Sequence, residues 1–202
     1  MLSNSSYKTV LHRRTKKRNS SFLPRAFESA RYTQNLWGRS FDHSSLDWKK
    51  NLVELSSTLS PVQENDIIEY DEMWSFVHDK KNKQWLWLAV LRRTRQVVAF
   101  HIGDRDYIAF RELYSKIPNE YKECQSRSDF WEAYDNLPKQ LHQKCGKESG
   151  ETSQVESVNN VIRQRLGRFV RKTCSFSKSI VNHIKVTGLF LQEYNLERLS
   201  VK

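Results

Sequence analysis

The chain has 202 residues, of which 38% are hydrophobic, and only 6 Gly and 4 Pro, which excludes collagen-like and Gly/Ser-rich low-complexity proteins. Its longest apolar run has seven residues, far below the roughly 20 of a membrane-spanning helix, and no apolar signal segment opens the sequence. The formal net charge of +11 points to a polyanionic partner such as nucleic acid. Three cysteines without a C-x-x-C pair argue against a disulfide framework and suit a reducing cytoplasm.

The positive charge is concentrated in the first third of the chain. Residues 1–60 hold 11 Lys and Arg against 4 Asp and Glu, whereas residues 61–202 hold 23 against 19. The first 25 residues have too few apolar side chains to offset the entropy lost on ordering. We therefore expect a basic, largely disordered N-terminal arm over 1–60, a linker beginning at Ser60-Pro61, and one folded domain over 61–202.

Three aromatic and β-branched runs follow the linker. Polar segments at 79–82 and 93–95 separate them, which predicts an antiparallel three-stranded meander. Short strands and helices then alternate, which indicates an α/β fold. The predicted strands are 67–78, 84–92, 96–103, 121–126 and 140–145, and the predicted helices are 107–117, 130–137, an apolar stripe running from 153 to 169, and 179–194.

Three acidic residues stand at unusual positions in this pattern. Asp71 lies inside the first predicted strand, where acids are depleted, and its alternative role is a solvated charge at a sheet edge. Asp129 and Glu156 stand at predicted helix starts, where spacing alone favours helix capping. The capping boxes would be Asp129 with Glu132 and Ser153 with Glu156.

Five stretches carry a more specific pattern. They are residues 70–77 (YDEMWSFV), 85–87 (WLW), 128–134 (SDFWEAY), 146–160 (GKESGETSQVESVNN) and 163–179, which includes RQRLGRFVRKT. Together they resemble the core of a DDE transposase of the insertion sequence one family over about residues 64–195. The resemblance implies a ribonuclease H-like mixed sheet flanked by helices. It also implies that Asp71, Asp129 and Glu156 are the catalytic residues and hold Mg²⁺ or Mn²⁺.

The chemistry of these acids suits the implied reaction. Mg²⁺ is a hard ion that prefers oxygen ligands, and two such ions can assist an in-line displacement at phosphorus. Water would nick DNA at the element's end, and the released 3′-OH would then attack target DNA. Three carboxylates gathered about 4–5 Å apart would repel one another by roughly 4 kcal/mol per pair without metal.

A basic segment follows Glu156 and contains no acid between Val161 and Lys178. On a helix, Asn160 and Arg163 would share a flank with Glu156, so DNA phosphates could lie beside the catalytic acids. The alternative is a solvated basic face. The predicted DNA-binding residues are Asn160, Arg163, Arg165, Arg168, Arg171, Lys172 and Lys178, with Lys80, Lys81 and Lys83 as weaker candidates.

Two functional hypotheses follow. The first is a metal-dependent transposase that binds double-stranded DNA of element ends and target, as a homo-oligomer on DNA in the nucleoid of the cytoplasm. The resembled family places a zinc-binding segment and a helix-turn-helix before the core, and residues 1–60 match neither, so an upstream zinc-finger or helix-turn-helix protein of the same element is an expected partner. The second hypothesis is a truncated, non-catalytic DNA-binding remnant.

Overall fold

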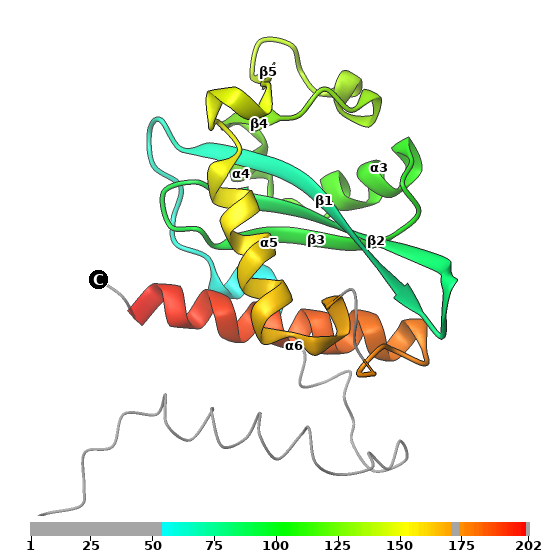
Figure 1. The fold of residues 1–202 in the computed structure, drawn as a ribbon. Helices are drawn as coiled ribbons and strands as arrows, with labels where there is room; N and C mark the ends of the chain where they lie inside the picture. The colour runs from blue at the N-terminus through cyan, green and yellow to red at the C-terminus, as the bar shows by residue number, and fades with distance from the viewer. Residues whose placement is uncertain (1–53, 171–173, 201–202) are drawn as a thin grey trace, which may run out of the picture. The chain divides into compact units, whose positions relative to one another are not determined.

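The computed structural model describes residues 54–170 and 174–200, so most of the predicted N-terminal arm lies outside the described residues. A five-stranded sheet with strand order β3-β2-β1-β4-β5 forms the centre of this part (Figure 1). β1 (Ile67–Val77), β2 (Asp79–Leu91) and β3 (Val97–Gly103) form the predicted antiparallel meander. β4 (Gln125–Ser128) and β5 (His142–Lys144) continue the sheet parallel to β1. This mixed sheet confirms the ribonuclease H-like prediction.

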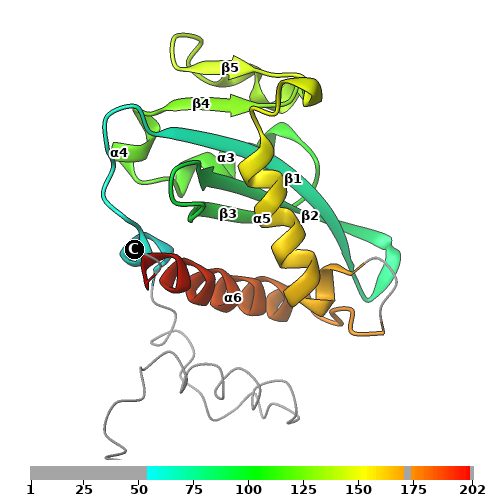
Figure 2. The ribbon, with the colours of Figure 1, turned by 60° about the vertical axis from the view of Figure 1, so that its left-hand side comes forward.

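Helices cover both faces of the sheet (Figure 2). The buried apolar residues form two clusters, one on each face of the sheet, and the helices in each cluster show which face they cover. One face carries α3 (Tyr107–Ser115), α4 (Asn119–Lys122) and the 3₁₀ helix η2 (Glu132–Asn136). The other carries α5 (Ser153–Arg165), the 3₁₀ helix η4 (Gly167–Phe169) and α6 (Ile180–Ser200). None of the described helices combines the length and apolar character needed to cross a membrane.

Alternation along the central strands assigns each side chain to a face. In β2, Trp87 belongs to the α3 cluster and Leu86 to the α5 cluster, as expected for a strand buried on both sides. In β1, Tyr70 packs toward α3 and Met73 toward α5. Odd-numbered residues of β1, including Asp71, therefore face α5, because side chains alternate with a period of two.

The first hairpin is longer than predicted. The polar segment 79–82, predicted as a turn, belongs to β2, and the chain reverses at His78, whose φ is 66°. Residues 79–83 are exposed, so this end of the strand extends beyond the core and needs no apolar side chains.

Three further predictions need correction. Tyr121, predicted in a strand, lies in α4, and only residues 125–128 pair as β4. The predicted helix over 130–137 is the short 3₁₀ helix η2. The helix predicted to continue to Phe169 ends at Arg165, where Leu166 turns to an extended conformation, and both Leu166 and Phe169 are still buried.

The described part of the chain packs from its beginning. The 3₁₀ helix η1 (Leu55–Thr58) precedes the predicted linker, and the backbone N–H of Ser60 donates to Gln96 at 2.9 Å. The hydroxyl of Tyr121 donates to the carbonyl of Ser60 at 2.5 Å. Residues 55–60 therefore belong with the folded domain, upstream of the predicted boundary at residue 61. The 3₁₀ helix η3 (Lys147–Ser149) lies between β5 and α5.

Candidate active site

Asp71 lies on the central strand, half-buried, and faces α5. The side-chain amide of Asn159, on α5, donates to Oδ2 of Asp71 at 2.6 Å. A solvated position at a sheet edge is excluded for Asp71, because its side chain is half-buried and hydrogen-bonded to Asn159.

The environment of Asp71 disfavours its charged form. Burial, together with the nearby carboxylate of Glu72, raises the pKa of Asp71 to about 7. The charges of Asp129 and Glu156 also raise this pKa, by smaller amounts. Asp129 and Glu156 are therefore close enough to Asp71 for their charges to act on it.

Asp129 follows β4 directly. Glu69 on β1 is the parallel partner of Arg127 on β4. Asp71 follows Glu69 by two residues, and Asp129 follows Arg127 by two residues, so both acids come after the same paired position. The carboxylate of Asp129 accepts a hydrogen bond from the backbone N–H of Trp131 at 2.9 Å. It does not cap a helix as the spacing suggested, because η2 begins only at Glu132 and has no side-chain cap.

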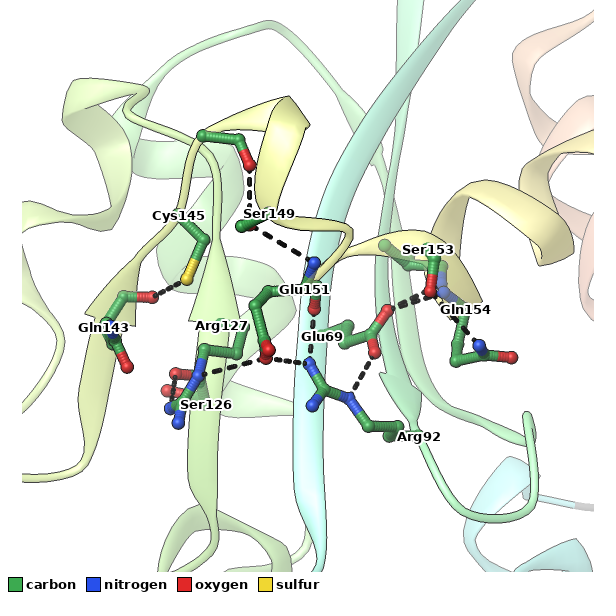
Figure 3. Close-up of polar contacts among 12 residues, drawn as sticks. Glu69, Arg92, Ser126, Arg127, Gln143, Cys145, Ser149, Glu151, Ser153 and Gln154 are labelled. Atoms are coloured by element: carbon green, nitrogen blue, oxygen red, sulfur yellow. Dashed lines mark hydrogen bonds and ion pairs between the residues drawn. The ribbon is translucent and has the colours of Figure 1, made fainter.

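Glu156 lies in the first turn of α5 and is exposed. The predicted capping box of Ser153 and Glu156 is wrong, since Ser153 lies inside the helix and the backbone N–H of Glu156 bonds to the carbonyl of Thr152. The helix start is instead bound by Glu69, whose Oε2 accepts from the backbone N–H groups of Gln154 and Val155 (Figure 3). Glu156 is thus not needed as a cap and remains exposed beside β1.

The three predicted acids and Asn159 offer oxygen ligands to a cation. Among residues 54–170 and 174–200, no three His, Cys, Asp or Glu side chains already surround one point closely enough to hold a metal ion. Two observations nevertheless fit a hard cation: carboxylates raise the pKa of Asp71, and the buried Oδ1 of Asn159 has no hydrogen-bond partner in this part of the chain. Mg²⁺ and Mn²⁺ match such oxygen donors.

A shallow hollow of about 280 Å³ opens beside Asp129. Phe130, 69% exposed, and Trp131 line it together with Arg105. The guanidinium of Arg105 lies 4.1 Å from the Trp131 ring centre and pairs with Glu72 at 2.5 Å. The hollow adjoins the Asp129 side of the candidate site.

The predicted DNA-binding residues divide into two groups. Asn160 and Lys178 are exposed, and Arg163 is half-buried on α5. Arg165 instead forms a two-point ion pair with Glu197 on α6, at 2.6 and 2.7 Å, and Arg168 donates to Ser177 at 2.9 Å. Arg171 and Lys172 lie outside the described residues. Lys80, Lys81 and Lys83 are exposed on the first hairpin.

Sequence reasoning missed two residues of this site, Glu69 and Asn159. Glu69 is a second acid inside the predicted strand, two residues before Asp71, and that i, i+2 spacing was the available signal for a shared face. The sequence predicted Asn160 as a DNA-binding residue and gave no role to Asn159. In the structure Asn159 is buried, and its side chain contacts Asp71.

The sequence is similar to proteins of insertion elements. The family model of the IS1 transposase matches residues 66–197. Protein InsB of insertion element iso-IS1n from Shigella dysenteriae is 36% identical over 129 residues, which cover 63% of this chain and 95% of that protein. Protein InsB of insertion element IS1 2 from Escherichia coli K12 is 32% identical over 159 residues, covering 77% and 92%.

Among solved structures, the HTLV-2 integrase catalytic core domain in complex with magnesium, in its trimeric form, aligns with 68% of this chain and 86% of its own, at a TM-score of 0.38 and 15% identity. The family match over residues 66–197 covers more than half of the sequence. The chain therefore belongs to the IS1 transposase family.

Proposed function

We propose that this protein is a DNA transposase that performs metal-dependent strand cleavage and strand transfer of an insertion sequence, with Asp71, Asp129 and Glu156 as its catalytic acids. The observation that carries the proposal is the electrostatic coupling of these acids. They come from a central strand, a loop and a helix, and the charges of two of them raise the pKa of the third.

The three acids would hold Mg²⁺ or Mn²⁺. Such ions, when bound, activate the attacking oxygen and stabilise the leaving oxygen at phosphorus. The chain's own contribution is position: β1 fixes the backbone of Asp71, and the amide of Asn159 orients its carboxylate. Asp129 is tied by its bond to the N–H of Trp131.

Two displacements at phosphorus complete the proposed reaction. In the first, water attacks the phosphodiester at the element's end, and the P–O bond to the element's 3′ oxygen breaks, which leaves a 3′-OH. In the second, this 3′-OH attacks a phosphodiester of the target, and the target strand's own 3′ oxygen leaves. No covalent enzyme intermediate is required, so no Ser or Cys nucleophile is needed.

The DNA would lie along the flank of α5 next to Glu156. Asn160 is exposed one helical turn after Glu156, and Arg163 follows it on the same helix. Phosphate contacts of this kind position a duplex without reading its sequence. Recognition of a particular terminal repeat is assigned to the expected upstream partner.

A nicking assay on labelled element-end DNA tests the proposal. Purified wild-type protein should nick the DNA in Mg²⁺ or Mn²⁺ and not in EDTA. Asp71→Asn, Asp129→Asn and Glu156→Gln should each reduce nicking by at least about 10³-fold, because each removes an acid of the site. Glu112→Gln, at an exposed acid of α3 on the opposite face of the sheet, is the matched control and should nick normally.

The same proteins give a second result in thermal unfolding. Mg²⁺ or Mn²⁺ should raise the melting temperature of the wild type, and Asp129→Asn should reduce that rise. Unchanged nicking by Asp129→Asn would contradict the assignment of the acids. Salt-dependent DNA binding with no nicking in either metal, with and without the upstream protein, would identify the protein as a DNA-binding remnant.

A further inference from the structure

Glu69 is a fully buried residue of β1, and its carboxylate binds the start of α5 and the side chain of Arg92 (Figure 3). Its Oε2 accepts from the backbone N–H groups of Gln154 and Val155, both at 2.9 Å. Its Oε1 accepts from Nε of Arg92 at 2.6 Å. Three donors thus satisfy one buried charge, and two of them are N–H groups that a helix start leaves unpaired.

The same strand face holds a second attachment of α5. Asp71 stands two residues after Glu69 on β1 and accepts from the Asn159 amide. The two attachment points on α5, at residues 154–155 and at 159, are about one helical turn apart. Two separate points on one helix restrict both its sliding along β1 and its rotation.

Glu156 lies between these two points on α5. Its distance from Asp71 is therefore determined by how α5 is attached to β1. Apolar contacts support the attachment, since Val155 and Val158 pack in the same cluster as Met73 of β1. Such contacts are not directional, whereas the bonds to Glu69 specify one position of the helix.

The loop before α5 is held by the same network. Arg92, besides binding Glu69, donates to the carbonyl and the carboxylate of Glu151, the latter at 2.9 Å. Arg127 of β4 lies 3.7 Å from the same carboxylate. Arg92, which follows β2, and Arg127 of β4 thereby bind Glu151, which lies two residues before α5.

We propose that Glu69 is a positioning residue of the transposase site: its carboxylate anchors the first turn of α5 and so sets the placement of Glu156 relative to Asp71. This inference rests on the proposed function for the role of Glu156. The anchoring itself is independent of that function and can be measured separately.

The test compares Glu69→Gln with Asp66→Asn in the full-length protein. Asp66 is a matched control, because it is also a buried carboxylate that binds an arginine, Arg93 at 2.7 Å, and a backbone N–H, that of Gln63 at 2.8 Å. Its bonds hold the segment before β1 and do not involve α5. Both variants should lower the melting temperature.

Two readouts separate the variants. Hydrogen exchange of the metal-free protein should be at least tenfold faster in residues 153–158 of Glu69→Gln and unchanged there in Asp66→Asn. Titration with Mn²⁺, followed by electron paramagnetic resonance, should show roughly 10- to 100-fold weaker binding by Glu69→Gln and less than a twofold change in Asp66→Asn, as for loss of a group that orients a ligand. Arg92→Gln, a change at a partly exposed partner, should shift both readouts in the same direction by a smaller factor and carries the test if Glu69→Gln does not fold.

The outcomes are distinguishable. Equal Mn²⁺ affinity in Glu69→Gln and Asp66→Asn would overturn the positioning role, as would unchanged exchange in residues 153–158. A wild-type protein that binds Mn²⁺ no better than Asp71→Asn would instead overturn the proposed function, and the exchange result would then decide the anchoring alone.

Discussion

Arg165 shows how a partner far along the chain changes the role of a basic side chain. Its sequence context, six basic residues without an acid, favours a phosphate contact. In the structure its guanidinium meets the carboxylate of Glu197 through two bonds and lies 5.4 Å from the ring centre of Phe190. Arg165 therefore connects α5 to α6, and Glu197, 32 residues away, could not be paired with it from local spacing.

This difference predicts opposite effects of two charge removals. Arg165→Gln should lower the stability by up to about 1 kcal/mol, the usual range of a partly exposed ion pair, and leave the salt dependence of DNA binding unchanged. Lys178→Gln, at an exposed lysine, should reduce the slope of log K against log salt by about 1 and leave stability unchanged. Fluorescence anisotropy with duplex DNA at several salt concentrations between about 50 and 200 mM measures the slopes. Over this range the affinity should change by about tenfold or more.

Equal slopes for the two variants would contradict the division of basic residues drawn from the structure. The control is Glu197→Gln, which removes the acidic partner of Arg165 and keeps the positive charge of the guanidinium. It should lower stability as Arg165→Gln does and should not reduce the slope.

Helix α6 is tied to β1 through a buried histidine. His183 lies between two serine hydroxyls, Ser75 of β1 at 2.8 Å from Nε2 and Ser177 at 2.7 Å from Nδ1. Burial, with a contribution from the positive charge of Arg168, lowers the pKa of His183 to about 4. The folded protein thus holds this ring neutral where an exposed histidine would take up a proton.

The contribution of His183 to the stability should therefore decrease as the pH falls, whereas the raised pKa of Asp71 acts in the opposite direction. Below a pKa of about 6.5 the unfolded chain binds a proton at His183 that the folded protein does not bind until about pH 4. This group alone accounts for a loss of up to about 3 kcal/mol between pH 6.5 and 4, with no further loss below. Urea unfolding of the wild type and of His183→Gln at pH 7, 6, 5 and 4 measures it, as the change in the stability difference between the two proteins.

His183→Gln should be less stable than the wild type at pH 7 and lose less stability on acidification. His142, whose pKa burial and the nearby Lys144 and Arg127 also lower to about 4, should contribute a similar and additive decrease. The prediction fails if His183→Gln and the wild type lose the same stability between pH 6.5 and 4.

Elements that depend on local pattern were predictable, and those that depend on distant partners were not. The run from Trp85 to Leu91 is apolar throughout, which suits a strand buried on both faces, and β2 has that position. The start of α5 shows the limit. The local sequence predicts a capping box of Ser153 and Glu156. In the structure Glu69, 85 residues before Gln154, accepts hydrogen bonds from the backbone N–H groups of the first turn instead. Likewise, the turn at Asp129 shortens a predicted helix to η2.

For the molecule as a whole, the antiparallel meander was predictable from its apolar runs and polar turns, whereas the ribonuclease H-like arrangement was expected from the family resemblance. The candidate site was accessible from the sequence only through the family resemblance, since spacing alone favoured capping for Asp129 and Glu156. The structure places Asp71 opposite α5 and adds Asn159 and Glu69 to the site. The side-chain arrangement around a cation depends on that cation and is not contained in spacing.

The central claim is that Asp71, Asp129 and Glu156 together hold a hard cation. Crystals of the protein soaked in Mn²⁺, with diffraction recorded above the manganese absorption edge, test it most directly. The account predicts an anomalous peak bounded by the three carboxylates, absent from crystals of Asp71→Asn treated in the same way. A wild-type map with no peak at these carboxylates, or a peak there that persists in Asp71→Asn, would contradict it.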